Sequence, residues 1–266
     1  MPLPRGYISH SQIRTYKECP QKYYFAYIEG IKPPINEKIF LGEMFHAAIE
    51  QFFILKISGT TLEEGEAGAV FSAAFDAASR DRKIKWHTPR RETRERGLAF
   101  LQYFLRHIAP AIKPLMVEKE LSAELPGTGV ILKGVIDLVE EDFSITDFKT
   151  TTSKWSPSKA RNSPQMIIYK YLFDRSFGPV QASLKYEVLY AKNAANIRHQ
   201  TFPVVPAADA MEKLLELIGH VVENINGGVF YANKNPFCKY CEFFELCQTS
   251  DSGPVPKSKK RLIDIF

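Results

Sequence analysis

The feature that most constrains this chain is a pair of aspartates set in two neighbouring β-rich segments, Val130–Glu140 and Ser144–Thr150. The short connection between these segments predicts a hairpin. Pairing that is symmetric about Asp142 places Asp137 directly opposite Asp147, with Cβ atoms about 5 Å apart. Like charges at that distance destabilise a hairpin, so the sequence requires something that compensates for them.

A divalent cation held between the two carboxylates supplies this compensation, because Mg²⁺ and Mn²⁺ prefer oxygen ligands. Asp137 lies between Ile136 and Leu138, and a carboxylate among apolar neighbours is costly unless it is paired or ligated. Lys149 follows Asp147 by two residues and therefore projects from the same strand face, about 6.6 Å further along. A lysine there can hold or activate a water molecule. The alternative is an ordinary hairpin whose Asp and Lys face solvent.

Three further side chains extend this candidate site. His46 lies on a strongly apolar segment, Gly42–Ile49, and is either a buried core histidine or a third metal ligand. Gln165 and Tyr169 are four residues apart on a helix expected at 163–174, which places them on one face.

The four cysteines form a second candidate site. Cys238, Cys241 and Cys247 follow a C-x₂-C-x₅-C spacing, and Cys19 lies 219 positions before Cys238. The N-terminus has no apolar core of signal-peptide length, so we expect a cytoplasmic protein, in which disulfides rarely persist. Four thiolates suit tetrahedral zinc or an iron–sulfur cluster, and the spacing does not choose between them.

The remaining pattern predicts an α/β core with a helical N-terminal lobe. Residues from 9 to about 124 have mostly helical periodicity. β-rich segments lie at 116–125, 183–191 and 197–205, and a last helix is expected at 207–226. We expect a lobe at 1–115, a core at 116–226, a cysteine segment at 227–250 and a basic tail at 251–266. A hydrophobic content of 45% excludes a disordered chain, and no apolar run reaches the roughly 18 residues of a membrane span.

The charge is locally concentrated. Lys and Arg number 35 against 30 Asp and Glu, and the segment 80–96 carries eight basic and three acidic residues. This segment is either a solvated helix face or a strip that contacts phosphates. The candidate DNA-contact residues are Arg90, Arg91 and Trp86, whose ring could stack on a base, and Lys154, Lys159 and Arg161.

In this order, Gly42…His46, Gly134…Asp137, Asp147…Lys149 and Gln165…Tyr169 resemble the motifs of the RecB-type branch of the PD-(D/E)XK nuclease superfamily. Ile136 stands where the superfamily's proline would be, an ordinary departure in this branch. The resemblance implies a restriction-endonuclease-like fold, a mixed central sheet flanked by helices. It implies that the metal ligands are His46, Asp137, Asp147 and a backbone carbonyl near Phe148. It also implies that Lys149 is catalytic, and that Gln165 and Tyr169 support the lysine or the scissile phosphate.

The four cysteines resemble those of the iron–sulfur nucleases of this branch, the CRISPR-associated RecB-like exonucleases and the nuclease domain of AddB. The resemblance implies a structural 4Fe–4S cluster on Cys19, Cys238, Cys241 and Cys247, a metal-cluster staple that joins the chain ends. Closing so long a loop restricts the unfolded chain and can contribute substantially to stability. Zinc remains the alternative at these cysteines.

The implied activity is that of a Mg²⁺- or Mn²⁺-dependent DNA nuclease, an exonuclease on single-stranded ends with 5′ to 3′ polarity. The alternatives are a catalytically silent DNA-binding or assembly subunit, and a zinc-stapled endonuclease. The last residues, Leu262–Phe266, resemble the peptides that dock bacterial sliding clamps, with Leu262 where glutamine is usual, or they are a simple tail. Oligomeric state and the biological process, whether CRISPR adaptation, recombination, phage replication or repair, stay open.

Overall fold

The computed structural model describes residues 3–60, 62–161 and 163–249. Within them the chain forms two compact units. The first consists of residues 3–33, 122–134 and 207–249, and the second of residues 34–121 and 135–206. The units therefore alternate along the chain, whereas the segments predicted from the sequence follow one another. The basic tail at 251–266 and the clamp-like peptide lie outside the described residues.

The second unit is built on a mixed sheet. Strand β6 (Ile145–Thr151) pairs in parallel with β7 (Leu184–Tyr190), and β7 pairs antiparallel with β8 (Arg198–Val204). The other neighbour of β6 is β5 (Ile131–Glu140), antiparallel to it. Leu138 pairs with Thr146 and Val139 with Ile145, a register symmetric about residue 142, so the predicted hairpin register is confirmed. Strand β4 (Pro114–Glu124) also pairs with β5.

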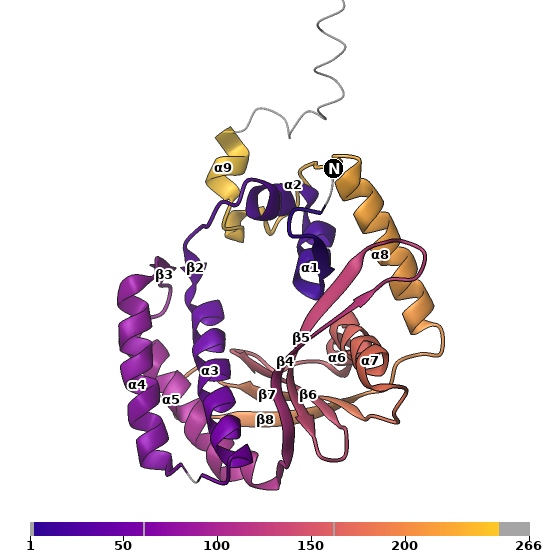
Figure 1. Ribbon diagram of the computed structural model, residues 1–266. Helices are drawn as coiled ribbons and strands as arrows, with labels where there is room; N and C mark the ends of the chain where they lie inside the picture. Colours follow the sequence, from indigo (N-terminus) through magenta and orange to yellow (C-terminus); the bar gives the residue numbers. More distant parts are fainter. Residues whose placement is uncertain (1–2, 61, 162, 250–266) are drawn as a thin grey trace, which may run out of the picture. The chain divides into compact units, whose positions relative to one another are not determined.

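Three helices of the second unit share one hydrophobic core with this sheet: α3 (Glu37–Ile57), α4 (Glu64–Asp81) and α5 (Arg90–His107) (Figure 1). Phe53 and Phe104 from the helices pack against Phe148 of β6, and Phe45 packs against Phe104. The helices approach closely at Gly97, where a Cβ atom would lie 2.5 Å from the Leu41 side chain. The helices that the sequence analysis assigned to an N-terminal lobe are thus part of the sheet's own core.

The start of α3 is fixed by the Asn36 side chain, which accepts a hydrogen bond from the Lys38 N–H. Two very short strands, β2 (Ile35–Asn36) and β3 (Ile84–Lys85), pair in parallel beside it. Because α3 continues for 21 residues, it carries both Lys38 and His46 along one packed helix.

Alternation along β6 turns Phe148 toward these helices, and Asp147 and Lys149 toward the opposite face. Helices α6 (Pro157–Arg161) and α7 (Pro164–Phe177) follow β6, and they contact β8 and β7 respectively. Apolar side chains of α7 are buried, whereas Gln165 is half-buried. The helix predicted at 163–174 is therefore present and runs about one turn longer.

The first unit joins segments that are far apart in the sequence. Strand β1 (Tyr7–Ser9) pairs in parallel with Ile131–Lys133, and α1 (His10–Glu18) contacts α8 (Ala210–Asn226). Short helical segments complete it: α2 (Pro20–Tyr23), a π-helical turn (Tyr24–Ile28), a 3₁₀ turn (Cys238–Tyr240) and α9 (Phe244–Thr249). A 3₁₀ turn at Ala109–Ala111 belongs to the second unit.

Aromatic rings connect the two ends of the chain within the first unit. The ring of Phe230 lies 6.3 Å from Tyr23 and 5.3 Å from Tyr24, and the Tyr16 hydroxyl donates to the Val229 carbonyl at 2.6 Å. Among the described residues, no helix has both the length and the apolar character needed to span a bilayer.

Candidate metal centre and cysteine site

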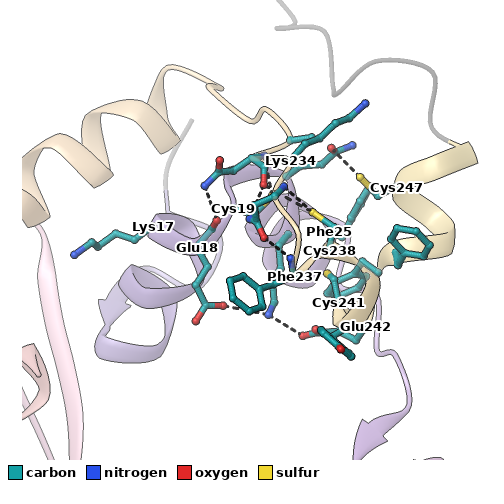
Figure 2. Close-up of a pocket in the computed structure, with 18 residues that line it drawn as sticks. Lys17, Glu18, Cys19, Phe25, Lys234, Phe237, Cys238, Cys241, Glu242 and Cys247 are labelled. Carbon is teal, nitrogen blue, oxygen red and sulfur yellow. Dashed lines mark hydrogen bonds and ion pairs between the residues drawn. The ribbon is translucent and has the colours of Figure 1, made fainter. Parts of the chain in front are cut away.

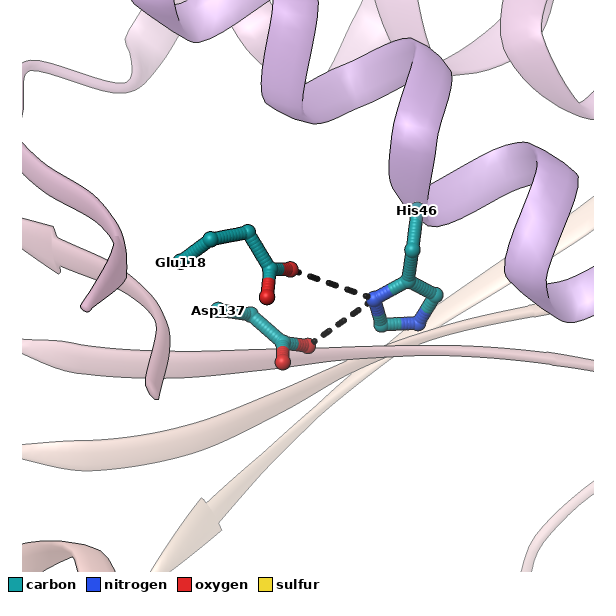
Figure 3. A group of neighbouring side chains, drawn as sticks. All are labelled: His46, Glu118 and Asp137. Atoms are coloured by element: carbon teal, nitrogen blue, oxygen red, sulfur yellow. Dashed lines mark ion pairs between the residues drawn. The ribbon is translucent and has the colours of Figure 1, made fainter. Parts of the chain in front are cut away.

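Figure 3 shows three side chains of the second unit whose ligand atoms converge: His46 on α3, Glu118 on β4 and Asp137 on β5. Their nitrogen and oxygen atoms all lie within 4.8 Å of one another. His46 Nδ1 lies 3.4 Å from Asp137 Oδ2 and 3.9 Å from Glu118 Oε1. One imidazole and two carboxylates form a donor set that a divalent cation accepts.

The backbone of Phe148 contacts two members of this group, Asp137 and the His46 nitrogen that faces away from the carboxylates. Its N–H donates to Asp137 Oδ2 at 2.9 Å, and its carbonyl oxygen lies 2.9 Å from His46 Nε2. The strand β6 therefore brings a peptide oxygen to the site and at the same time orients the Asp137 carboxylate.

Asp147 lies outside this ligand group, although it is fully buried. Its Oδ2 lies 2.6 Å from Lys149 Nζ, and its Oδ1 accepts a hydrogen bond of 2.8 Å from Gln165 Nε2. Gln165 also donates to the Tyr169 hydroxyl oxygen at 2.7 Å, as their spacing on one helix face predicts. The result is a connected row, Lys149–Asp147–Gln165–Tyr169, beside the ligand group.

Burial and mutual repulsion govern the charges here. Burial raises the pKa of Asp147, and the Asp137 carboxylate raises it further, against the opposing effect of Lys149. Burial also raises the pKa of Asp137, although His46 and Lys149 oppose this. For His46, burial alone would lower the pKa, but Asp137, Glu118 and Asp147 raise it to about 9. His46 and Lys149 thus balance only part of the negative charge of the three carboxylates of Glu118, Asp137 and Asp147. An excess of carboxylate charge is the electrostatic condition of a metal site.

Glu118 is the residue that sequence reasoning missed. It lies on a strand with three glutamates, Glu118, Glu120 and Glu124, and no spacing distinguishes one from the others. Its φ of 43° is unusual for a residue other than glycine. Such backbone conformations cluster at functional sites.

The four cysteines line one cavity of about 420 Å³ in the first unit (Figure 2). The backbone N–H groups of Asn233 and Asn235 donate to the sulfurs of Cys19, at 3.4 Å, and Cys238, at 3.3 Å. Among the residues that the structure describes, no three cysteine sulfurs lie within 4.8 Å of one another. Burial raises the pKa of the Cys241 and Cys247 thiols, and the nearby Cys19 adds to this.

The candidate DNA-contact residues differ in their surroundings. Trp86 packs against Phe40 and Phe75, with ring centroids 6.0 and 6.3 Å away, so its ring is engaged in the core. Arg90 pairs with Asp76 at 2.7 Å, and Arg91 with Glu95 at 2.8 Å.

The three residues that follow β6 are likewise exposed, but no ion pair engages them in the part of the chain that the structure describes. Lys154 and Arg161 are exposed, and Lys159 lies 4.3 Å above the ring of Trp155. These three therefore remain better placed for a phosphate than the residues on α5.

The PD-(D/E)XK nuclease superfamily matches residues 7–248, and the chain belongs to this superfamily. The fold and the family together define a nuclease. The crystal structure of a "putative exonuclease" from Eubacterium rectale has the same fold, with a TM-score of 0.59 and 12% identity over 98% of this chain and 94% of that one.

A second solved structure, SSO0001, has a TM-score of 0.29 and 16% identity over 82% of this chain and 87% of that one. No protein with a curated description matches the sequence significantly.

Proposed function

We propose that this chain is a Mg²⁺- or Mn²⁺-dependent deoxyribonuclease of the RecB-type branch that degrades single-stranded DNA from an end, 5′ to 3′. The observation that carries the proposal is the convergence of His46, Glu118 and Asp137, whose charges interact with Lys149. The Phe148 carbonyl lies against the second ring nitrogen of His46. Strandedness and polarity rest on the motif resemblance.

The residues present fit a divalent cation. His46, Asp137 and the Phe148 carbonyl would hold it, with Glu118 as a further carboxylate, and Asp147 is the ligand that the motif resemblance adds. When bound, the cation would polarise the phosphodiester and stabilise the negative charge that develops on phosphorus.

Lys149 acts on the reacting water. Its Nζ is held 2.6 Å from Asp147 Oδ2 and is half-buried, so it has a fixed position and an open side. From there it holds the water or a phosphate oxygen in line with the bond that breaks. Gln165 and Tyr169 are positioning residues. Gln165 donates to the Asp147 carboxylate, which holds the lysine, and it also donates to the Tyr169 hydroxyl.

For the cysteines we propose a structural 4Fe–4S cluster. A closed tetrahedral zinc site has sulfurs about 3.8 Å apart, from Zn–S bonds of about 2.3 Å. Among the described residues no three cysteine sulfurs lie that close together, and the cavity that all four line has room for a group larger than one ion. The choice of a cluster over zinc rests on the motif resemblance. The two N–H donors to sulfur are of the kind that accompanies iron–sulfur ligands. The cluster would tie Cys19 to the C-terminal triplet within the first unit.

The test of the nuclease compares linear and circular single-stranded DNA, labelled at either end, with Mg²⁺, Mn²⁺ or EDTA. We expect loss of linear DNA from the 5′ end, intact circles, and no reaction in EDTA. Lys149→Ala should be inactive, whereas Lys213→Ala, an exposed lysine paired with Asp209, should match the wild type.

Other outcomes identify the alternatives. Equal activity of Lys149→Ala and wild type would remove the proposed site, and cut circles would indicate an endonuclease. DNA binding without hydrolysis would indicate the silent subunit. The clamp-like peptide stays a prediction, tested by clamp pull-down with and without residues 262–266.

A further inference from the structure

A buried arginine in the second unit has unused hydrogen-bond donors. Arg96 on α5 is 4% exposed, and its Nη1 donates to the Lys192 carbonyl at 3.3 Å. Its Nε and Nη2 have no hydrogen-bond partner in the part of the chain that the structure describes. Leaving charged donors unsatisfied in a protein interior is costly, so these two atoms point to a missing acceptor.

A small hollow lies beside this arginine. Arg96 lines it together with Lys38 on α3, the side chains of Leu41 and Phe100, and the end of β6 at Thr150–Thr152. The hollow has room of about 10 Å³, which is about one oxygen atom of a water or a phosphate. The residues that line it include an arginine, a lysine and three threonines, whose polar groups together suit an anion.

The hollow lies on the same helix and strand as the metal ligands. Three positions of α3 show this. His46 contacts the Phe148 carbonyl, and a Cβ atom at Gly42 would lie 3.7 Å from Thr150 Oγ1. Lys38, nearer the start of the helix, lines the hollow. Lys38 and His46 are eight positions apart, which corresponds to about 12 Å of helix. One DNA strand advances about 3.4 Å per nucleotide in a duplex and further when extended, so this distance is a few nucleotides.

Glu37 is the negatively charged neighbour of Arg96. Its side chain is fully buried, neither carboxylate oxygen has a hydrogen-bond partner among the described residues, and its charge acts on Arg96. It does not line the hollow. Glu37 therefore offsets part of the arginine's charge without using its donors, and it would oppose an anion bound there.

We propose that Arg96, Lys38 and Thr150–Thr152 form a subsite for a backbone phosphate of the DNA strand, a few nucleotides from the bond that is cut. The inference rests on the proposed nuclease function. The planar fork of Arg96 binds a phosphate oxygen through the two free donors, and Lys38 closes over it from the rim. The subsite reads backbone and carries no base specificity.

The test measures affinity for a fluorescent single-stranded oligonucleotide in EDTA, which prevents cleavage, over a series of salt concentrations. We expect Arg96→Met to bind about tenfold more weakly. Lys38→Ala should bind several-fold more weakly and lower the salt slope by about one contact. Glu37→Gln should bind more tightly, because it removes a negative charge at constant size. Lys213→Ala should match the wild type.

The substitutions separate binding from folding. Thermal unfolding of each variant is measured in parallel, and Lys38 is exposed, so its removal leaves the core intact. A purely structural role of Arg96 and Glu37 predicts weaker binding in both variants, whereas the subsite predicts opposite signs.

If the wild type binds and degrades DNA while Arg96→Met and Lys38→Ala bind with unchanged affinity and salt slope, the subsite is wrong and the nuclease stands. If the wild type neither binds nor degrades DNA, the proposed function itself fails, and the subsite fails with it.

Discussion

Lys149 Nζ lies 2.6 Å from Asp147 Oδ2, two residues earlier on the same face of β6. The carboxylate is fully buried, whereas the lysine remains partly open. The buried Asp147 carboxylate therefore holds the Lys149 ammonium group through one oxygen and accepts a hydrogen bond from Gln165 through the other. This arrangement makes the lysine's position depend on residues from two elements, β6 and α7.

Replacing Asp147 by Asn keeps the size of the side chain and removes its charge. Lys149 then loses its anchor, and we expect the rate of DNA hydrolysis to fall at least a hundredfold. Oligonucleotide affinity in EDTA should stay within about twofold, since this carboxylate makes no proposed phosphate contact. Retained hydrolysis with Asn at this position would show that the lysine does not need the charge.

Gln165→Met removes the bonds to Asp147 and Tyr169 without changing the helix. We expect kcat to fall about tenfold or more with KM unchanged, because the lysine is less well positioned. Tyr169→Phe removes one of the two bonds and should have a smaller effect. A rise in KM with kcat unchanged in Gln165→Met would assign this glutamine to substrate binding instead.

Glu118→Gln tests the carboxylate that the structure adds to the site. Because its oxygen lies among the ligand atoms of His46 and Asp137, we expect Mn²⁺ affinity, measured by calorimetry, to fall at least tenfold. Glu141→Gln, an exposed substitution at the hairpin turn, is the matched control. Unchanged Mn²⁺ affinity would leave Glu118 as a neighbour and not a ligand.

The raised pKa of His46, about 9, makes metal binding dependent on pH. A base whose pKa is raised in the folded state is protonated at pH 7, and an imidazole must lose its proton to ligate a metal. Binding of Mn²⁺ at pH 7 should therefore release about one proton from His46, and affinity should rise with pH up to about 9.

The same raised pKa sets the sign for stability without metal. His46 contributes stability that is fully present below its ordinary value of 6.5 and is lost as the pH rises through about 9. The protons that Mn²⁺ binding releases are counted by calorimetry in buffers of different ionisation enthalpy. His46→Ala should release about one proton fewer, and an equal count would exclude His46 as the source.

Cys19→Ala tests the proposed cluster. We expect anaerobically purified wild type to absorb in the visible range and to contain iron, and the variant to lose both and to unfold at a lower temperature. Zinc without visible absorbance would favour the zinc alternative. A variant with full iron content and full nuclease activity would rule out Cys19 as a ligand.

Much of the site was predictable because short-range rules determine it. The symmetry about residue 142 follows from the hairpin connection, and the Gln165–Tyr169 contact follows from helical spacing. The approach of His46 to β6 came from motif resemblance, since nothing local in the sequence brings α3 to that strand.

The remainder depends on packing between distant elements. Glu118 was one of three glutamates on its strand, and its unusual φ is visible only in the structure. In the basic segment 80–96, Arg96 is buried whereas Arg90 and Arg91 are exposed and paired with acids. Trp86, expected to be free for a base, instead fills space between two phenylalanines. Charge composition alone gives no access to such differences.

Anomalous diffraction at the manganese edge, from crystals grown with Mn²⁺, locates a bound cation directly. We expect a peak bound by His46, Asp137 and the Phe148 carbonyl oxygen, within reach of Lys149. Strong peaks elsewhere, with none at these three ligands, would contradict this expectation.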